Sequence, residues 1–185
     1  MKQGRISTKK LTVTAVLMAM NIIMSTSVLS LPVPGGHMYL NDAIIVTAAV
    51  LLDPLCAFLV GGVGAFIGDM LFYPTPMFVS LATHGLQAVV ISLIAHKALR
   101  NKPVAASVIG AVIGWIICFT GYTLGRAFIY STPAYAIAKF PFQVLQTAVG
   151  SAIALLLCWK AGVVKLYNRW YYKGTGDQGG LPKKA

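Results

Sequence analysis

Long apolar runs, separated by short polar or proline-containing segments, make up most of the 185-residue chain. A helix that crosses a bilayer needs about 20 mostly apolar residues. On this basis the pattern predicts six spans, at about residues 11–31, 40–52, 56–73, 77–98, 104–130 and 135–159. We therefore predict an all-α integral membrane protein of one domain, a six-transmembrane-helix bundle.

The second and third predicted spans lie in one continuous stretch, residues 41–74, around which the rest of the predicted fold is organised. This stretch holds three of the chain's four acidic residues, Asp42, Asp53 and Asp69. The Asp53-Pro54 pair interrupts it, because proline ends a helix and disfavours helical geometry just before it. We predict a hairpin that turns at Asp53. Its first leg covers only about 20 Å of a roughly 30 Å core, so neighbouring helices must shield it or it must extend into the preceding loop.

Charge is sparse and clustered. The chain is 57% hydrophobic and 10% charged, with a net charge of +11, whereas soluble domains carry about 25% charged residues. Basic residues gather at 2–10, 96–102 and 160–184, beside the apolar runs. Lysine and arginine are enriched in cytoplasmic loops, so we predict that both the N- and C-termini are cytoplasmic. The orientation of the spans in the membrane thus explains the excess of positive charge, and we expect no nucleic acid partner.

The segments outside the spans also permit predictions. The first apolar run is longer than the 7–15 residues typical of a signal peptide, so we expect it to be retained. Residues 31–42 read as an outside loop with two prolines and two glycines. An interfacial aromatic belt is predicted at Tyr167, Trp170, Tyr171 and Tyr172. Residues 174–185 read as a disordered tail, and the three cysteines as buried small hydrophobes.

The first span has two distinct faces. Ala15 and Ala19 are four residues apart, a spacing of small residues that lets helices approach closely in lipid. Thr14, Asn21 and Ser25 share the opposite face. We expect the polar face to point into the bundle and the small face to meet lipid or a second protein.

Polar residues also recur in the outer half of the later spans, at helical spacing. By the predicted topology they converge near the outside loop, at the same depth. Ionisable groups within spans are costly, so they are usually paired, cavity-facing or functional. We predict an outward-facing pocket for a small polar ligand, formed by His37, Tyr39, Asn41, Asp42, Asp69, His84, Gln87, Tyr122, Arg126, Lys139, Gln143 and Gln146. Tyr39, Phe72, Tyr73, Tyr122, Phe140 and Phe142 are candidates for stacking on a ring in that ligand.

Individually these residues have simpler explanations: Arg126 or Lys139 can snorkel to headgroups, and Asp69 can pair with either of them. The sequence lacks a Walker loop (GxxxxGK[ST]), HExxH and GxSxG. No cysteine has metal-ligand spacing with histidines. We therefore expect no catalytic site, metal or cofactor, and no ATPase activity of the chain itself.

Taken in order, these features resemble the substrate-binding S components of energy-coupling factor (ECF) vitamin transporters. The resemblance rests on the basic start, the AxxxA of the first span, Asn41-Asp42 followed by LLDP, and Gly68-Asp69 closing a Gly-rich span. The segment PTPMFVSLATHGLQAVVISLIAHK resembles the riboflavin-type and the hydroxymethylpyrimidine/pyridoxine-type branch. The family more often has Gly-Pro where this chain has Asp53-Pro54. The similarity covers roughly residues 8–160.

The resemblance implies a six-helix subunit of a bacterial cell membrane that holds a vitamin in its outer half and topples to carry it inward. It implies that Ala15 and Ala19 dock onto a membrane T component, which two cytoplasmic ATPases energise. A pyrimidine or pyridine alcohol fits best, but riboflavin, pantothenate or a thiamin precursor also fits. Two other functions stay open: a membrane enzyme acting on lipid, with His84 as acid/base, and an auxiliary packing subunit or small channel.

Overall fold

The computed structural model describes residues 7–26, 30–34, 36–99 and 101–172. Its elements, with η marking π-helical segments, are α1 (Thr8–Met24), β1 (Leu31–Val33), β2 (Gly36–Met38), α2 (Asn41–Leu51), α3 (Pro54–Phe58), η2 (Leu59–Val63), α4 (Gly64–Phe72), α5 (Met77–Leu93), η3 (Ile94–Ala98), α6 (Pro103–Gly125), η4 (Arg126–Tyr130), α7 (Pro133–Leu155), η5 (Leu156–Lys160) and α8 (Val163–Tyr172). Each π-helical segment continues a neighbouring α-helix, so several of these labels join into longer rods.

Within the described residues, four rods are long and apolar enough to cross a membrane: 54–72, 77–98, 103–130 and 133–160. They match the last four predicted spans to within two residues, and α2 matches the predicted 40–52. Apolar side chains on their outer faces, such as Val112 and Ile116 on α6, are exposed. Such a surface is compatible with lipid, where every backbone group must be satisfied within the helix. The prediction of an all-α membrane protein is therefore confirmed.

The first helix is shorter than predicted. α1 ends at Met24, and Leu31, expected as the end of the span, begins strand β1. Pro32 explains why Leu31 is not helical, because a proline disfavours helical geometry at the residue before it. The expected outside loop is also more regular than predicted, since β1 and β2 form a two-stranded antiparallel ribbon that pairs Leu31 with Met38.

The short helix α2 lies at the centre of the bundle. Its residues are buried apart from the half-buried Ile44, and it packs against α1, α5 and α7. It is thereby shielded as predicted. The helix ends before Asp53-Pro54, so the carbonyl groups at its C-terminal end lack partners within the helix. One of them is satisfied by α5, where Ser92 Oγ donates a 2.6 Å hydrogen bond to Leu52 O.

Glycines of α4 serve internal packing against α1. A Cβ on Gly64 would lie 2.9 Å from Asn21 Nδ2, and one on Gly68 would lie 2.7 Å from Ser25 Cβ. The polar face of α1 therefore lies against α4, and Thr14, Asn21 and Ser25 are buried as predicted. Asn21 Nδ2 also donates to Val60 O, at 2.7 Å, within the π-helical segment η2.

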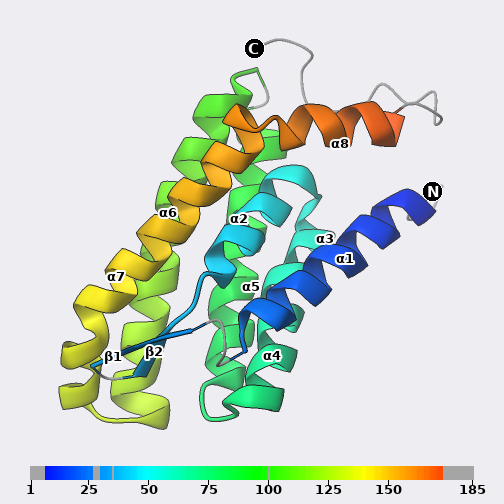
Figure 1. Cartoon of the computed structure of the whole chain (residues 1–185). Helices are drawn as coiled ribbons and strands as arrows, with labels where there is room; N and C mark the ends of the chain where they lie inside the picture. Colours follow the sequence, from blue (N-terminus) through cyan, green and yellow to red (C-terminus); the bar gives the residue numbers. More distant parts are fainter. Residues whose placement is uncertain (1–6, 27–29, 35, 100, 173–185) are drawn as a thin grey trace, which may run out of the picture.

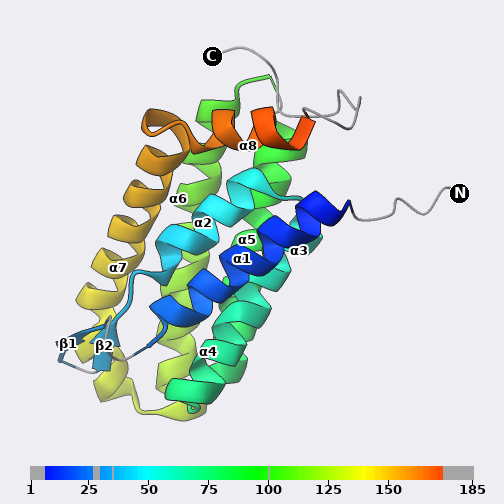
Figure 2. The ribbon, with the colours of Figure 1, turned by 45° about the vertical axis from the view of Figure 1, so that its right-hand side comes forward.

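Both views of the ribbon show two differently built ends (Figures 1 and 2). The start of α1, the α2–α3 turn and helix α8 lie at one end, and the β1–β2 ribbon lies at the other. At the first end Lys10 Nζ pairs with Asp53 Oδ1 at 2.7 Å. Helix α8, which the sequence did not predict, lies across this end, and Lys9 Nζ donates to Trp170 O at 3.0 Å.

The Lys10–Asp53 pair links α1 to the hairpin turn, and its contribution should depend on pH. Burial alone would raise the pKa of Asp53, but the hydrogen bond and charge of Lys10 outweigh it, so this pKa lies below its usual 3.8. Burial likewise works to lower the pKa of Lys10, yet the hydrogen bond to Asp53 leaves it above 10.5. A lowered carboxyl pKa stabilises the fold above pH 3.8, and a raised ammonium pKa stabilises it below pH 10.5.

We therefore expect Asp53→Asn to lower stability between about pH 4 and pH 10, and this loss to shrink as the pH falls below 3.8 through the lowered pKa of Asp53. Because Asp53 is 40% exposed, solvent screening limits the loss to about 1 kcal/mol. Thermal unfolding in detergent at pH 3 and pH 7, with Lys10→Met and the double variant completing the cycle, measures it. A pH-independent difference would contradict this prediction.

Candidate functional site

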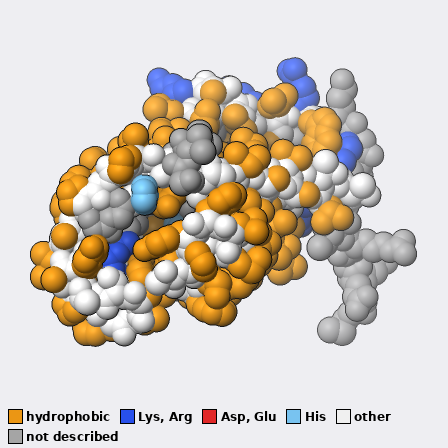
Figure 3. All heavy atoms as spheres, turned by 60° about the horizontal axis from the view of Figure 1, so that its bottom comes forward, with side chains coloured by type: hydrophobic (Ala, Val, Ile, Leu, Met, Phe, Trp, Pro, Cys, Tyr) orange, Lys and Arg blue, Asp and Glu red, His pale blue; other side chains and the backbone are white. Residues whose placement is uncertain are grey.

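A cavity of about 460 Å³ opens toward the end of the molecule that carries the β1–β2 ribbon. Nine of the twelve predicted pocket residues line it: His37, Tyr39, Asn41, Asp69, His84, Tyr122, Arg126, Gln143 and Gln146. Figure 3, which looks toward this end, shows a hollow with Lys or Arg atoms in its floor. The volume lies in the range of sites for small organic ligands.

Other residues line the cavity without having been predicted as polar contacts: Ser25, Tyr73, Pro76, Tyr130, Ser131 and Tyr135. Of the proposed stacking rings, Tyr39, Tyr73 and Tyr122 are lining residues. Phe72, Phe140 and Phe142 do not line this cavity, and Phe140 instead packs edge-on against Phe119. Helical spacing alone does not distinguish a cavity-facing ring from one on the outer surface.

Asp42, Gln87 and Lys139 lie behind the cavity wall. Asp42 and Gln87 are fully buried, and Gln87 Nε2 donates to Asp42 Oδ1 at 3.0 Å. The Gln87 oxygen is then free to accept, and it lies 2.7 Å from His84 Nδ1. Since an amide oxygen can only accept, His84 donates to it through Nδ1. Asp42 and Gln87 set the orientation of a lining histidine.

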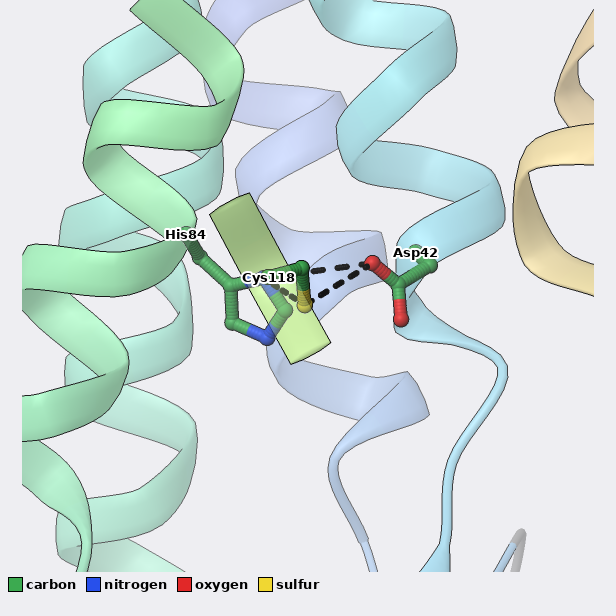
Figure 4. Close-up of side chains that lie close together, drawn as sticks. All are labelled: Asp42, His84 and Cys118. Atoms are coloured by element: carbon green, nitrogen blue, oxygen red, sulfur yellow. Dashed lines mark hydrogen bonds and ion pairs between the residues drawn. The ribbon is translucent and has the colours of Figure 1, made fainter. Parts of the chain in front are cut away.

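Cys118 belongs to this cluster, although the sequence interpretation treated it only as a buried small hydrophobe. Its Sγ lies 3.8 Å from Asp42 Oδ1 and 3.9 Å from His84 Nδ1 (Figure 4). Thr147 Oγ1 donates to the same sulfur at 3.6 Å. A signal was available, since Cys118 is four residues before Tyr122 and eight before Arg126, on one face of the rod 103–130.

The donor atoms of Asp42, His84 and Cys118 lie within 4.8 Å of one another, close enough to coordinate one metal ion. Carboxylate, imidazole and thiolate are the usual zinc ligands. Here, however, His84 Nδ1 already faces the Gln87 oxygen, so coordination through this nitrogen would break that hydrogen bond. The hydrogen-bond pattern favours a role in orienting His84.

A second chain of hydrogen bonds joins three helices at the cavity wall. Tyr122 Oη on α6 donates to Ser80 Oγ at 2.5 Å, and Ser80 Oγ on α5 donates to Asp69 on α4. Asp69 thus accepts a hydrogen bond from the Ser80 hydroxyl, which in turn accepts one from Tyr122. The alternative in which it pairs with Arg126 or Lys139 is wrong, because the described residues form no such ion pair within 4.0 Å.

Helix α7 holds the β1–β2 ribbon over the cavity. Lys139 is 1% exposed, and its Nζ donates to His37 O at 2.5 Å. The backbone N–H of Tyr39 donates to Gln146 Oε1 at 3.2 Å. Burial, reinforced by the negative charge of Asp69, raises the pKa of the Tyr39 phenol, which therefore remains a neutral hydroxyl at physiological pH.

Arg126 does not snorkel to the surface. It is only 9% exposed, lies in η4 against the Tyr130 ring at 5.7 Å, and lines the cavity. Its Nη1 is buried without a hydrogen-bond partner. Ala15 and Ala19 are exposed on α1, as the two-faced pattern of that helix predicted.

Comparison with known proteins places these features in a family. Residues 5–162 match the family described as ECF-type riboflavin transporter, S component. A protein from Pyrococcus woesei, described as an uncharacterized protein in gap 3'region, is 29% identical over 134 residues, which cover 71% of this chain and 88% of that relative. The family match spans all residues that line the cavity.

Proposed function

Because the chain belongs to the family of ECF-type riboflavin transporter S components, we propose that it binds a small water-soluble vitamin or vitamin precursor in the cavity beneath the β1–β2 ribbon. The observation that carries this proposal is the convergence of polar side chains from α2, α5, α6, η4 and α7 on one cavity. A cavity with a few convergent polar groups is the usual form of a small-ligand site.

The ligand most compatible with the lining is a substituted pyrimidine or pyridine, of the hydroxymethylpyrimidine or pyridoxine kind. Tyr39, Tyr73 and Tyr122 offer ring faces, and His84, Gln143 and Gln146 offer hydrogen bonds to ring nitrogens and hydroxyls. Riboflavin, which the family description names, is the principal alternative.

The arrangement in the membrane is proposed to be six spans with both termini in the cytoplasm. In the described parts, Lys9, Lys10, Lys165 and Arg169 belong to the elements at the α8 end. Positive residues favour the cytoplasmic side. The cavity then opens outward, where a scarce vitamin is captured.

Transport in this proposal needs partners, because the sequence contains no nucleotide-binding loop. A membrane T component docks on the exposed Ala15–Ala19 face of α1, and two cytoplasmic ATPases supply the energy. The complex is proposed to reside in the cell membrane of a bacterium. Such subunits are transporter components, and no catalytic role is assigned to His84.

Binding by the purified protein tests the proposal. Gln143 is 3% exposed and lines the cavity, so Gln143→Leu removes a hydrogen-bonding group that a bound ligand would use. We expect the affinity for hydroxymethylpyrimidine, pyridoxine or riboflavin, whichever binds, to fall about 10- to 100-fold. Isothermal titration in detergent measures this.

Asn101→Leu is the matched control, because Asn101 is exposed and lies in the α5–α6 connection, away from the cavity. It should bind like the unmodified protein. If ligand binding is indifferent to Gln143→Leu, the cavity is not the binding site, and a packing or channel role is favoured.

A further inference from the structure

Arg126 has an unusual environment for a cation within a membrane span. It is 9% exposed, and its guanidinium donates no hydrogen bond to another described residue, with Nη1 completely enclosed. Its Cζ lies over the Tyr130 ring, 5.7 Å from the ring centroid. A buried arginine is normally held by carboxylate or carbonyl oxygens, because its donors otherwise lose their hydration without replacement.

The acids of the outer half are engaged elsewhere. Asp69, the acid among the described lining residues, accepts a hydrogen bond from Ser80. Asp42 accepts from Gln87 and lies 4.0 Å from His84. Neither forms an ion pair with Arg126 within 4.0 Å. The guanidinium is therefore left without an anion among the described residues.

A second cation strengthens the positive field. Lys139 is 1% exposed, bonds to the His37 carbonyl, and is close enough to interact electrostatically with Arg126. Two buried cations that repel one another within a membrane span require a compensating negative charge. The face shown in Figure 3 displays Lys or Arg atoms in its hollow and no acidic side chain.

We infer that the ligand of this cavity carries an anionic group, a carboxylate or a phosphate ester, which binds to the guanidinium of Arg126. This inference rests on the proposed function and refines it to a vitamin-sized compound with an anionic substituent. A planar guanidinium binds two oxygens of such a group in parallel hydrogen bonds. The positive charge of Lys139 would add electrostatic attraction for the same anion. The Tyr130 hydroxyl, also buried without a partner, is a further donor beside Arg126.

The anion could come from a soluble compound or from a lipid headgroup of the outer leaflet. The first source is favoured because Arg126 lines the cavity and is nearly excluded from the outer surface of the bundle. The experiment must still separate the two.

Matched pairs of ligands test the inference, each pair differing in one anionic group: pyridoxine and 4-pyridoxate, nicotinamide and nicotinate, panthenol and pantothenate, riboflavin and its 5'-phosphate. We expect the anionic member of at least one pair to bind about 100-fold more tightly than its neutral partner. Arg126→Gln should reduce that preference by about 10- to 100-fold, and Lys139→Met should also reduce it. Arg169→Gln and Lys165→Met, both exposed on α8, are the matched controls and should preserve the preference.

Stability of the ligand-free protein provides a second readout. If Arg126 awaits an anionic ligand, Arg126→Gln should unfold at the same temperature or higher, because an unpaired buried charge has been removed. A large drop in unfolding temperature would assign Arg126 a structural role and overturn the inference.

The remaining outcomes are distinct. Equal or tighter binding of the neutral members overturns the inference and leaves the proposed function standing. Failure of all eight compounds and of hydroxymethylpyrimidine to bind overturns both. Each titration is repeated in nanodiscs of phosphatidylglycerol; if the preference vanishes there, the anion is a lipid headgroup and the soluble-ligand inference is wrong.

Discussion

Replacing Ala15 with tryptophan is expected to abolish vitamin uptake by the assembled transporter while leaving ligand binding unchanged. Ala15 and Ala19 are exposed on α1, and the opposite face of this helix is buried against α4. Small residues allow two helices in lipid to approach closely, and an indole side chain prevents that approach. Because the cavity lies elsewhere, we expect at least a tenfold loss of uptake with binding affinity within twofold of the unmodified protein.

Uptake of radiolabelled vitamin by cells that contain the T component and the ATPases measures the first effect, and titration of the purified subunit measures the second. Ala152→Trp is the matched control: Ala152 is also exposed, but it lies on α7. If both variants transport normally, the small face of α1 is not the docking surface. If Ala15→Trp also loses binding, it disturbs the subunit itself.

A second large effect is expected at Gly61, where three segments meet without room for a side chain. A Cβ there would lie 2.9 Å from Ala88 Cβ, 2.9 Å from His84 O and 3.0 Å from Ile45 Cγ2. One of these atoms is backbone and all belong to buried residues, so none can move easily. We expect Gly61→Ala to destabilise the fold by roughly 2–3 kcal/mol, and to lower the unfolding temperature by about 5–10 °C.

Gly110→Ala is the control, because its Cβ would meet Ile91 atoms at an ordinary 3.4 Å. Since alanine favours a helix over glycine, this variant should be as stable as the unmodified protein or slightly more so. Thermal unfolding in one detergent compares the two. Equal unfolding temperatures for the two variants would contradict this prediction, because α2 and α5 would then make room for a side chain at Gly61.

Much of the fold could be predicted because the bilayer imposes a simple length rule on apolar helices. The last four spans were located to within two residues, and Asp53-Pro54 marked a turn that the structure confirms. The end of α1 and the β1–β2 ribbon were missed, since a short ribbon in a proline-rich segment leaves no periodic signal. Helix α8 was missed because its aromatic residues were assigned only to an interface.

The candidate site divides in the same way. Helical spacing grouped Tyr122 with Arg126 and Gln143 with Gln146, because residues three or four apart share a helix face. It could not show that Asp42 and Gln87 lie behind the wall, that Cys118 joins them, or that Arg126 lacks an anion. These facts depend on contacts between helices distant in sequence.

The sequence by itself thus determined where the long apolar helices lie and which helix faces are polar, because hydrophobicity and helical periodicity act on local stretches of chain. Only the tertiary structure decided which polar groups satisfy one another and which remain unpaired in the cavity. Which polar groups pair depends on the distances between helices, and these distances result from the close packing of many side chains at once.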